Sequence, residues 1–376
     1  MTKKIKFGII GCGLMGREFA SAAARWCHLD GDITTPEVFG ISDTNPEMFK
    51  WFEKHLPGLK IKTLDYRELL TSKDIEAVYC AVPHFLHEKI FIDVIKAGKH
   101  LLGEKPFGID AAANTKILAA LKANPKVFAR SSSEFPFFPA CNRLIGMIKN
   151  EEFGRLLEVK AGFCHSSDMD TSKPINWKRQ AKFNGEYGCL GGLGIHVEHV
   201  PFRLGWIPKT VHARLSKFVD KRPDGKGGAA ECDTWDNAFM SCDVSDKNGS
   251  FPMYLETKRM EPGATNMWYL RVSGMAKSVY FTTDDPNALH FLETKGNEQS
   301  WSRIVVGYKP QFPAITGGIF EFGFPDAILQ MLAAFITELS GKTADFGCFR
   351  PEETAISHAL HTAALKSQKN KSVEVV

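Results

Sequence analysis

The stretch GIIGCGLMG, residues 8–16, decides how the first part of this chain folds. It follows a short apolar run that is typical of a buried strand, and it leads into a helical pattern. Gly11, Gly13 and Gly16 have the G-x-G-x-x-G spacing that joins a strand to a helix around a pyrophosphate. Backbone N–H groups at the start of such a helix attract phosphate oxygens. The stretch therefore predicts a dinucleotide-binding βα unit.

The residues of this turn and one later carboxylate are the first candidate cofactor contacts. Asp43 follows a predicted strand over 37–42, where it can accept hydrogen bonds from an adenosine ribose, although the insertion HLDGDITTPE places it beyond the usual ~20 residues. An acidic side chain repels a 2′-phosphate and no arginine lies in 40–47, so we predict NAD(H) rather than NADP(H). The alternative is that the glycines serve only a tight turn. The candidates in the turn are Gly11, Cys12, Gly13, Leu14, Met15 and Gly16.

The rest of the first third repeats the βα pattern. Strands are expected over 77–82 and 100–103, and the helix between them, over 87–97, is stopped by Gly98. Alternating strands and helices are typical of a doubly wound parallel sheet. We therefore predict an N-terminal Rossmann domain over 1–129.

The pattern changes after residue 129, where longer β-like segments are separated by polar loops. This is typical of an antiparallel sheet that is open on at least one face. The fold class is thus α/β, with a second α/β domain over 130–376 that holds a large open, mainly antiparallel sheet. Helical patterns over 326–339 and 351–365 are expected to pack on this sheet or to return to the first domain. The predicted strands cover 156–162, 238–244, 253–258, 269–274 and 278–281.

Composition excludes several classes of partner. The net charge is only +4, and no basic run suggests binding to nucleic acid or to an anionic membrane surface. No apolar stretch approaches the roughly 18 residues of a membrane helix, and the start does not resemble a signal peptide, so we expect a cytoplasmic protein. The nine cysteines contain no C-x-x-C pair, which favours reduced, mostly buried thiols and no structural zinc site.

Two further motifs resemble those of a known family. The segments AVPHFLHEKI (81–90) and GKHLLGEKPFG (98–108), after the glycine turn, are similar to the Gfo/Idh/MocA family of nicotinamide-dependent oxidoreductases. The segment over 351–375 resembles the closing helix and strand of that family, and the Glu-Lys-Pro triplet at 104–106 is the most specific match. The resemblance implies hydride transfer to or from a sugar, glycoside or cyclitol. It also implies a homo-oligomer, a dimer or tetramer, formed through the open sheet.

The resemblance implies that Lys105 is the active-site lysine near the nicotinamide. Hydride removal from a secondary alcohol requires the hydroxyl proton to leave, so an acid–base group and a cation beside the developing alkoxide both help. The alternative is a solvated surface lysine. His87 is either a cofactor contact or a polar residue in the first turn of the next helix. The further cofactor contacts implied here are Ala81, Pro83, His84, His87, Glu104 and Lys105.

In the segment LGGLGIHVEH (190–199) we expect a glycine-rich turn followed by two histidines, which are the remaining candidate catalytic residues. The family often has an aspartate four residues before its catalytic histidine; here the histidine is His196 and the earlier position is Gly192. His199 stands where a second acidic residue is frequent. We predict that His196 takes the hydroxyl proton while Lys105 stabilises the alkoxide, with His199 as a further candidate.

Two alternatives remain for these histidines. His196 and His199 share a helix face and could hold a metal ion, but their spacing matches no zinc-helix motif and we predict no metal. His199 could also be a satisfied structural residue. His165 and Trp177 are candidate substrate contacts, Trp177 because an indole can stack on the apolar face of a sugar ring.

The missing aspartate leaves the type of reaction open. Some relatives oxidise a sugar hydroxyl only transiently and then eliminate a glycosidic group, so a glycoside-cleaving enzyme that keeps its NAD is the second hypothesis. Other relatives are non-catalytic regulators that sense a nucleotide or sugar. The intact triplet Glu104-Lys105-Pro106 argues against a sensor. We predict an NAD-dependent dehydrogenase acting on a small-molecule sugar, glycoside or cyclitol.

Overall fold

The computed structural model describes residues 4–376 and divides into two compact units. One unit comprises the chain up to Phe137 together with Lys309–Glu352. The other comprises Phe138–Tyr308 and Glu353–Val376. The predicted boundary after residue 129 lies close to Phe137, where the chain first passes from one unit to the other. The second domain was predicted to cover all of 130–376, but Lys309–Glu352 belong to the first unit.

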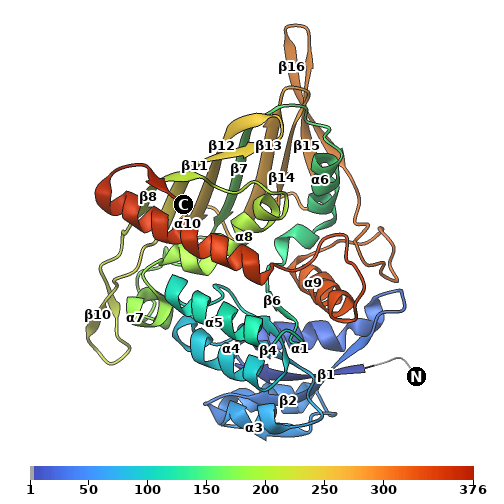
Figure 1. Ribbon diagram of the computed structural model, residues 1–376, viewed down its shortest axis with the longest axis vertical. Helices are drawn as coiled ribbons and strands as arrows, with labels where there is room; N and C mark the ends of the chain where they lie inside the picture. Colours follow the sequence, from blue (N-terminus) through green and yellow to red (C-terminus); the bar gives the residue numbers. More distant parts are fainter. Residues whose placement is uncertain (1–3) are drawn as a thin grey trace. The chain divides into compact units, whose positions relative to one another are not determined.

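The first unit is built on a six-stranded parallel sheet with the strand order β3-β2-β1-β4-β5-β6 (Figure 1). This order confirms the predicted Rossmann fold, in which a ligand binds at the carboxyl ends of the strands where the order reverses. That reversal lies between β1 and β4. The strands are β1 (Lys4–Ile10), β2 (Thr35–Ser42), β3 (Ile61–Thr63), β4 (Ala77–Cys80), β5 (His100–Gly103) and β6 (Ala129–Ser131).

Helices cover both faces of this sheet because its strands are apolar on both sides. On one face, Phe7 of β1 packs against Phe19 of α1 and Phe335 of α9, with ring centroids 5.1 and 6.3 Å away. On the other face, Ile10 and Val78 belong to a buried cluster with residues of α3, α4 and α5. The helices of the unit are α1 (Leu14–Ala24), α2 (Phe49–His55), α3 (Tyr66–Thr71), α4 (His87–Lys96), α5 (Ala111–Ala123) and α9 (Phe324–Leu339).

The two C-terminal helices join different units. Helix α9, predicted over 326–339, returns to the first unit, where its residues from Ala327 to Thr337 are all buried. Helix α10 (Pro351–Asn370) belongs to the second unit from Glu353 onward. Of the two options predicted for these helices, α9 takes the return to the first unit, and α10 from Glu353 onward belongs to the unit of the large sheet.

The second unit contains a nine-stranded sheet with the order β16-β15-β14-β13-β7-β12-β11-β8-β17. All neighbouring strands are antiparallel except β7 and β12, which confirms the predicted, mainly antiparallel sheet. The five predicted strands are present as β7, β11, β12, β13 and β14. The strands are β7 (Leu156–Cys164), β8 (Thr210–Ser216), β11 (Asn237–Asp246), β12 (Gly249–Lys258), β13 (Met267–Gly274), β14 (Ser278–Thr282), β15 (Ala288–Lys295), β16 (Glu298–Val305) and β17 (Glu374–Val375), beside a small separate pair, β9 (Lys221–Pro223) and β10 (Ala229–Glu231).

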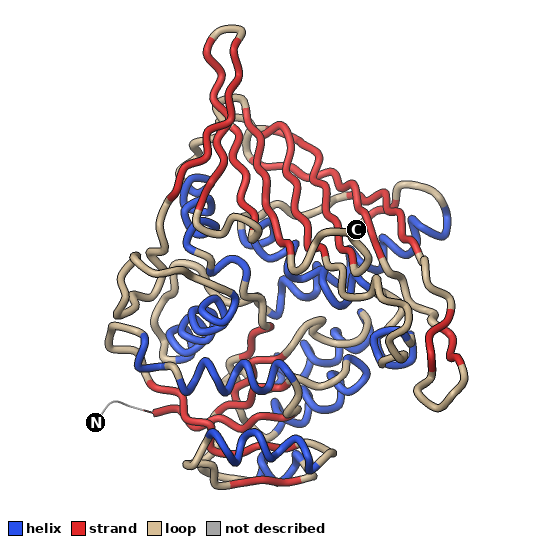
Figure 2. The backbone as a smooth tube through the Cα atoms, turned by 180° about the vertical axis from the view of Figure 1, so that it is seen from behind, coloured by secondary structure: helices blue, strands red, loops and turns tan. Residues whose placement is uncertain are grey.

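One face of the large sheet is covered by helices and the other face is bare. Figure 1 shows α8 and α10 in front of the strands, and Figure 2, seen from behind, shows the strands without a covering helix. Along β11, alternate residues such as Ala238 and Met240 are buried, while Phe239 between them is 44% exposed. The helices of this unit are α6 (Pro139–Lys149), α7 (Ala181–Asn184), α8 (Cys189–Arg203) and α10.

The structure also bears on the cysteines and on membrane insertion. All nine cysteines are free thiols and only Cys27 is exposed, which confirms the prediction of reduced, mostly buried thiols. Among residues 4–376, no helix has both the length and the hydropathy needed to cross a bilayer.

Candidate active site

The glycine turn between β1 and α1 has the geometry of a pyrophosphate-binding loop. Gly11 has a φ of +96°, and a Cβ there would collide with the carbonyl oxygen of Ala81. A Cβ on Gly16 would collide with the carbonyl oxygen of Gly11, whereas one on Gly13 would meet no atom within 4 Å. The first glycine thus permits the turn, the third permits close packing, and the second leaves space for a ligand.

Asp43 lies directly beside this turn, as the sequence predicted. Its Oδ2 accepts a hydrogen bond from the backbone N–H of Cys12 at 2.8 Å, and its Oδ1 accepts one from Asn45 N at 2.9 Å. The first turn of α1, which begins at Leu14, contains no acidic residue that would repel a phosphate. The open space at Gly13, the free helix start and the carboxylate at the end of β2 together fit a dinucleotide.

The loop after β4 contains Ala81, Pro83, His84 and His87, all predicted as cofactor contacts. Ala81 N donates to the carbonyl oxygen of Ile10 at 2.8 Å, so this loop runs alongside the glycine turn. His87 is fully buried, with Nε2 2.9 Å from Val82 O and Nδ1 3.0 Å from Pro106 O. Burial lowers the pKa of His87, which favours the neutral ring. Because both ring nitrogens face backbone carbonyls, His87 connects two loops and has no free nitrogen for a cofactor.

The Glu-Lys-Pro triplet follows β5 at the carboxyl edge of the parallel sheet. Glu104 is 6% exposed, and its Oε1 accepts hydrogen bonds from Tyr79 Oη at 2.8 Å and from Ser132 Oγ at 2.5 Å. Lys105, the next residue, is only partly buried. Glu104 therefore fixes the backbone while the side chain of Lys105 remains accessible. Burial, strengthened by the charge of Glu104, raises the pKa of Tyr79 well above its usual value, so Tyr79 acts as a hydrogen-bond donor.

Glu134 is a titratable residue of this region that the sequence reasoning missed. It is 4% exposed, and burial followed by the negative charge of Glu104 raises the pKa of its carboxyl to about 8, while Lys105 opposes the shift. Such perturbed groups concentrate at functional sites. The available signal was a single acid in the apolar run SSSEFPFFP, but the sequence did not show that it would be buried beside Glu104.

The second group of candidates lies on α8, and here the structure differs from the expected glycine-rich turn. Gly191, Gly192 and Gly194 lie inside a continuous helix whose residues from Cys189 to Phe202 are all buried. Glycine disfavours a helix interior, but close packing can override this preference. A Cβ on Gly192 would collide with Arg259 Nη2, and one on Gly194 would collide with the imidazole of His361. The glycines are therefore needed for close approach to the helix.

His196 and His165 are brought together around one aromatic ring in the second unit. The Phe163 ring lies 5.2 Å from the His196 ring in an edge-on arrangement and 4.5 Å from the His165 ring. His196 is 3% exposed, and its backbone oxygen accepts a hydrogen bond from Trp268 Nε1 at 2.9 Å. This cluster joins α8 to the carboxyl end of β7, where His165 is partly exposed.

The other two candidates of the second unit occupy different surroundings. His199 is fully buried on α8, three residues beyond His196. Trp177 is partly buried in a short 3-10 helix over Trp177–Arg179, with Lys178 Nζ 5.8 Å above its ring. Among the residues described, no group of three or more His, Cys, Asp and Glu side chains is arranged to hold a metal ion.

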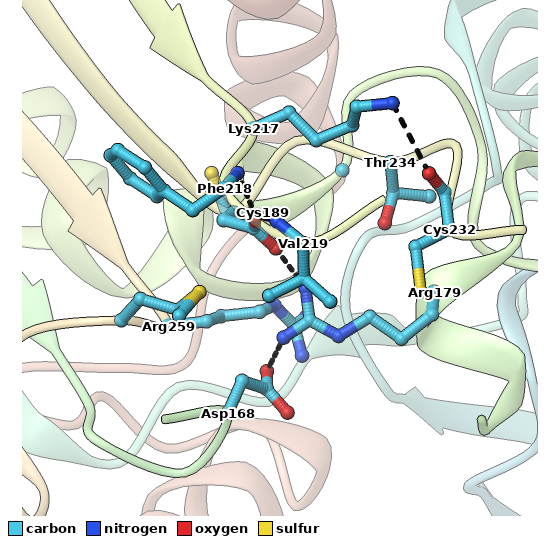
Figure 3. Close-up of polar contacts among 12 residues, drawn as sticks. Asp168, Arg179, Cys189, Lys217, Phe218, Val219, Cys232, Thr234 and Arg259 are labelled. Atoms are coloured by element: carbon cyan, nitrogen blue, oxygen red, sulfur yellow. Dashed lines mark hydrogen bonds and ion pairs between the residues drawn. The ribbon is translucent and has the colours of Figure 1, made fainter. Parts of the chain in front are cut away.

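The position of the missing aspartate is occupied by a cation. The guanidinium of Arg259, the residue after β12, lies over Gly192, with Cζ 3.2 Å from the place of a Cβ there. Figure 3 shows Arg259 next to Arg179, whose Nη2 forms an ion pair with Asp168. Arg179 Nη1 pairs with Asp236. The side chain that fills the space at Gly192 is therefore that of Arg259, 67 positions later in the chain.

The N-terminal unit has the sequence of a known family. Residues 5–131 match the family described as "Oxidoreductase family, NAD-binding Rossmann fold". Residues 5–131 thus carry the NAD-binding Rossmann domain of the Gfo/Idh/MocA family. The match confirms the resemblance carried by the glycine turn and the Glu-Lys-Pro triplet.

The similarity to curated relatives extends beyond the family match over residues 5–131. The levoglucosan dehydrogenase of Pseudarthrobacter phenanthrenivorans is 27% identical over 228 residues, which cover 60% of this chain and 58% of the relative. The glucose-6-phosphate 3-dehydrogenase of Bacillus subtilis is 28% identical over 222 residues, which cover 58% of this chain and 60% of the relative. The chain therefore spans less than two thirds of the length of both relatives.

Solved structures share the fold over the whole chain. Levoglucosan dehydrogenase in complex with NADH and L-sorbose has a TM-score of 0.88 and 21% identity, covering 100% of this chain and 99% of that chain. An inositol dehydrogenase homolog from Azotobacter vinelandii complexed with NAD+ has a TM-score of 0.81 and 17% identity, covering 100% and 98%. At these identities the likeness establishes the fold of both units.

Proposed function

We propose that this protein is an NAD(H)-dependent oxidoreductase acting on a secondary hydroxyl or ketone of a sugar, glycoside or cyclitol. The observation that carries the proposal is the end of β5, where buried Glu104 is anchored and Lys105 stays accessible at the carboxyl edge of an NAD-binding sheet. Relatives named levoglucosan dehydrogenase, glucose-6-phosphate 3-dehydrogenase and inositol 2-dehydrogenase support the substrate class.

In this proposal the chain supplies two groups to the reaction. The ammonium group of Lys105 stabilises negative charge on the substrate oxygen. His196 holds or releases the hydroxyl proton, since an imidazole exchanges protons near neutral pH. His165 and Trp177 are the proposed substrate contacts. His199, which is fully buried on the helix face of His196, is proposed to act through His196.

The cofactor assigned to this site is NAD(H). A bound nicotinamide supplies the hydride acceptor or donor. The backbone N–H groups of the turn from Gly11 to Gly16 would hold the pyrophosphate, and Asp43 would accept hydrogen bonds from the adenosine ribose. The carboxylate of Asp43 favours NAD(H) because it repels a 2′-phosphate. His87 and Glu104 are positioning residues that keep the two neighbouring loops in place.

The experiment that tests the function is a panel of sugars, cyclitols and glycosides incubated with NAD⁺. We expect one of them to give NADH in stoichiometric amount, measured by absorbance, together with the corresponding ketone. Release of an aglycone without net NADH would instead identify the glycoside-cleaving alternative. A protein that binds the panel compounds without forming any product would overturn both activities.

We also propose that the protein is a homo-oligomer, a dimer or tetramer, formed through the bare face of the large sheet. Aromatic side chains gather there: Phe239 is 44% exposed and stacks on Tyr254 with centroids 5.9 Å apart. Exposed apolar patches of this kind mark contact surfaces. Light scattering should show an oligomer that dissociates in Phe239→Lys but not in Met275→Lys, whose exposed side chain lies on the β13–β14 turn. A monomeric wild type would contradict the proposal.

A further inference from the structure

Arg259 is a buried cation that forms no ion pair within the described part of the chain. Its side chain is 7% exposed, and its Nε has no hydrogen-bond partner. Among the residues described, no carboxylate oxygen lies within 4 Å of its guanidinium, whereas Arg179 beside it pairs with both Asp168 and Asp236. A buried charge is costly unless it is paired. Arg259 therefore lacks the partner that its burial requires.

Both oxygens of the neighbouring Asp236 carboxylate are engaged by other groups. Besides pairing with Arg179, Asp236 accepts hydrogen bonds through Oδ2 from Phe218 N at 2.6 Å and from Val219 N at 3.2 Å. Burial lowers the pKa of Arg259, the charge of Arg179 lowers it further, and Asp168 and Asp236 offset only part of this effect. The two arginines and two aspartates together carry no net charge. Both aspartates pair with Arg179, however, so the positive charge of Arg259 is not paired.

Arg259 lies in the same part of the second unit as His196, the proposed catalytic histidine. Gly192, which Arg259 covers, is one helical turn before His196 and therefore shares its face of α8. Arg259 follows β12, which runs parallel to β7 with Lys258 opposite Cys164, so Arg259 and His165 lie at neighbouring strand ends. The first turn of α8 has no acidic residue, and its N–H groups add further positive potential.

We infer that Arg259 binds an anionic group of the substrate, so that the preferred substrate is an acidic sugar. A guanidinium contacts two oxygens of a carboxylate or a phosphate in parallel, which suits either a sugar acid or a sugar phosphate. Gly192 and Arg259 occur together because any side chain at 192 would displace the guanidinium. The inference deepens the proposed function and rests on it for the chemistry at the hydroxyl group.

The kinetic test compares D-glucose, D-glucuronate and D-glucose 6-phosphate, each with NAD⁺. We expect one acidic sugar to be oxidised, and Arg259→Met to lower its kcat/KM by at least about 100-fold, a much larger loss than the variant causes for glucose. The matched control is Arg303→Met, an exposed arginine of β16, which should not alter either value. The two acidic probes distinguish a carboxylate from a phosphate as the recognised group.

Equilibrium binding separates failure of this inference from failure of the proposed function. Calorimetric titration with both acidic probes should show binding to the wild type that is lost in Arg259→Met and retained in part by Arg259→Lys, which keeps the charge. Binding that depends on Arg259 without any NADH formation would overturn the dehydrogenase and leave the anion site standing. Oxidation of an acidic sugar that is equal in wild type and Arg259→Met would overturn the anion site and leave the dehydrogenase standing. Circular dichroism shows whether each variant is folded. If Arg259→Met does not fold, weakened binding of the acidic probes to Arg259→Lys is the test of the anion site.

Discussion

At the scale of single residues, Lys105 is the most informative position to change. Replacing it by Met removes the cation beside the substrate oxygen but leaves the anchored Glu104 and the glycine turn in place. Turnover should fall by about 10²–10⁴-fold, while the affinity for NADH, measured by fluorescence titration, should stay nearly the same. Lys116→Met, at an exposed lysine of α5, is the control. Near-normal turnover of Lys105→Met would contradict the assignment of Lys105 as the cation beside the substrate oxygen.

Asp43 controls the predicted choice of cofactor. Its replacement by Ala removes the negative charge beside the turn and the hydrogen bond from Cys12 N. The ratio of kcat/KM for NAD⁺ over NADP⁺ should therefore fall by at least about tenfold, mainly because NAD⁺ binds less tightly. The measurement is steady-state kinetics with both cofactors. A wild type that strongly prefers NADP⁺ would refute the role of Asp43.

Glu134 predicts a dependence of stability on pH. The pKa of its carboxyl is about 8 in the folded protein, against 4.5 as its ordinary value. The folded state therefore binds the additional proton between these values, and the contribution of Glu134 to the free energy of unfolding falls as pH rises through that window. The loss is at most about 1.4 kcal/mol for each pH unit.

The comparison that checks this is urea denaturation of wild type and Glu134→Gln at about pH 5 and about pH 8. Gln cannot ionise, so the variant should gain stability relative to wild type as the pH is raised. Equal pH dependence in the two proteins would show that Glu134 is not held protonated.

At the scale of elements, helix α8 is stabilised by side chains that its glycines allow to approach. His361 Nε2 lies 2.6 Å from Glu198 Oε1, and Ser357 Oγ donates to Glu198 Oε2 at 2.5 Å, so α8 and α10 share a buried polar network. A Cβ on Gly194 would collide with the His361 ring.

Two glycine substitutions in helices of the same unit should therefore have opposite effects. Gly194→Ala should lower the free energy of unfolding by about 1–3 kcal/mol because it overpacks the network. Gly146→Ala, on α6 where a Cβ would meet nothing within 4 Å, should raise it by about 0.5–1 kcal/mol through better helix propensity. Urea unfolding measures both, and stabilisation by Gly194→Ala would contradict the packing described here.

The same helix shows where sequence reasoning succeeds and where it stops. The turn from Gly11 to Gly16 and the place of Asp43 are local consequences of strand, glycine and helix, and the structure has them as predicted. The glycines of α8 predicted a turn because glycine alone disfavours a helix, and the packing that reverses this comes from Arg259 and His361, distant in sequence. The burial of Glu134 beside Glu104 is likewise a tertiary property that no local pattern contains.

At the scale of the whole molecule, each unit is assembled from two separate parts of the chain. Phe335 of α9 packs on Phe7 and lies 5.3 Å from Phe128, so the first unit is incomplete without Lys309–Glu352. A polypeptide of residues 1–137 should therefore expose apolar surface and aggregate. Joining 309–352 to it through a flexible linker should give a folded protein that binds NADH, as measured by gel filtration and fluorescence. A soluble, NADH-binding 1–137 would show that α9 is dispensable.

The late position of α9 also has a consequence for how the protein is made. The ribosome must add Phe138–Tyr308 between the two parts of the first unit. At roughly 5–20 residues per second, the nascent sheet waits on the order of 10–30 s for the helix that covers Phe7. During that interval an apolar surface is open to other chains, so the yield of folded protein in the cell should depend on chaperones and on the speed of translation.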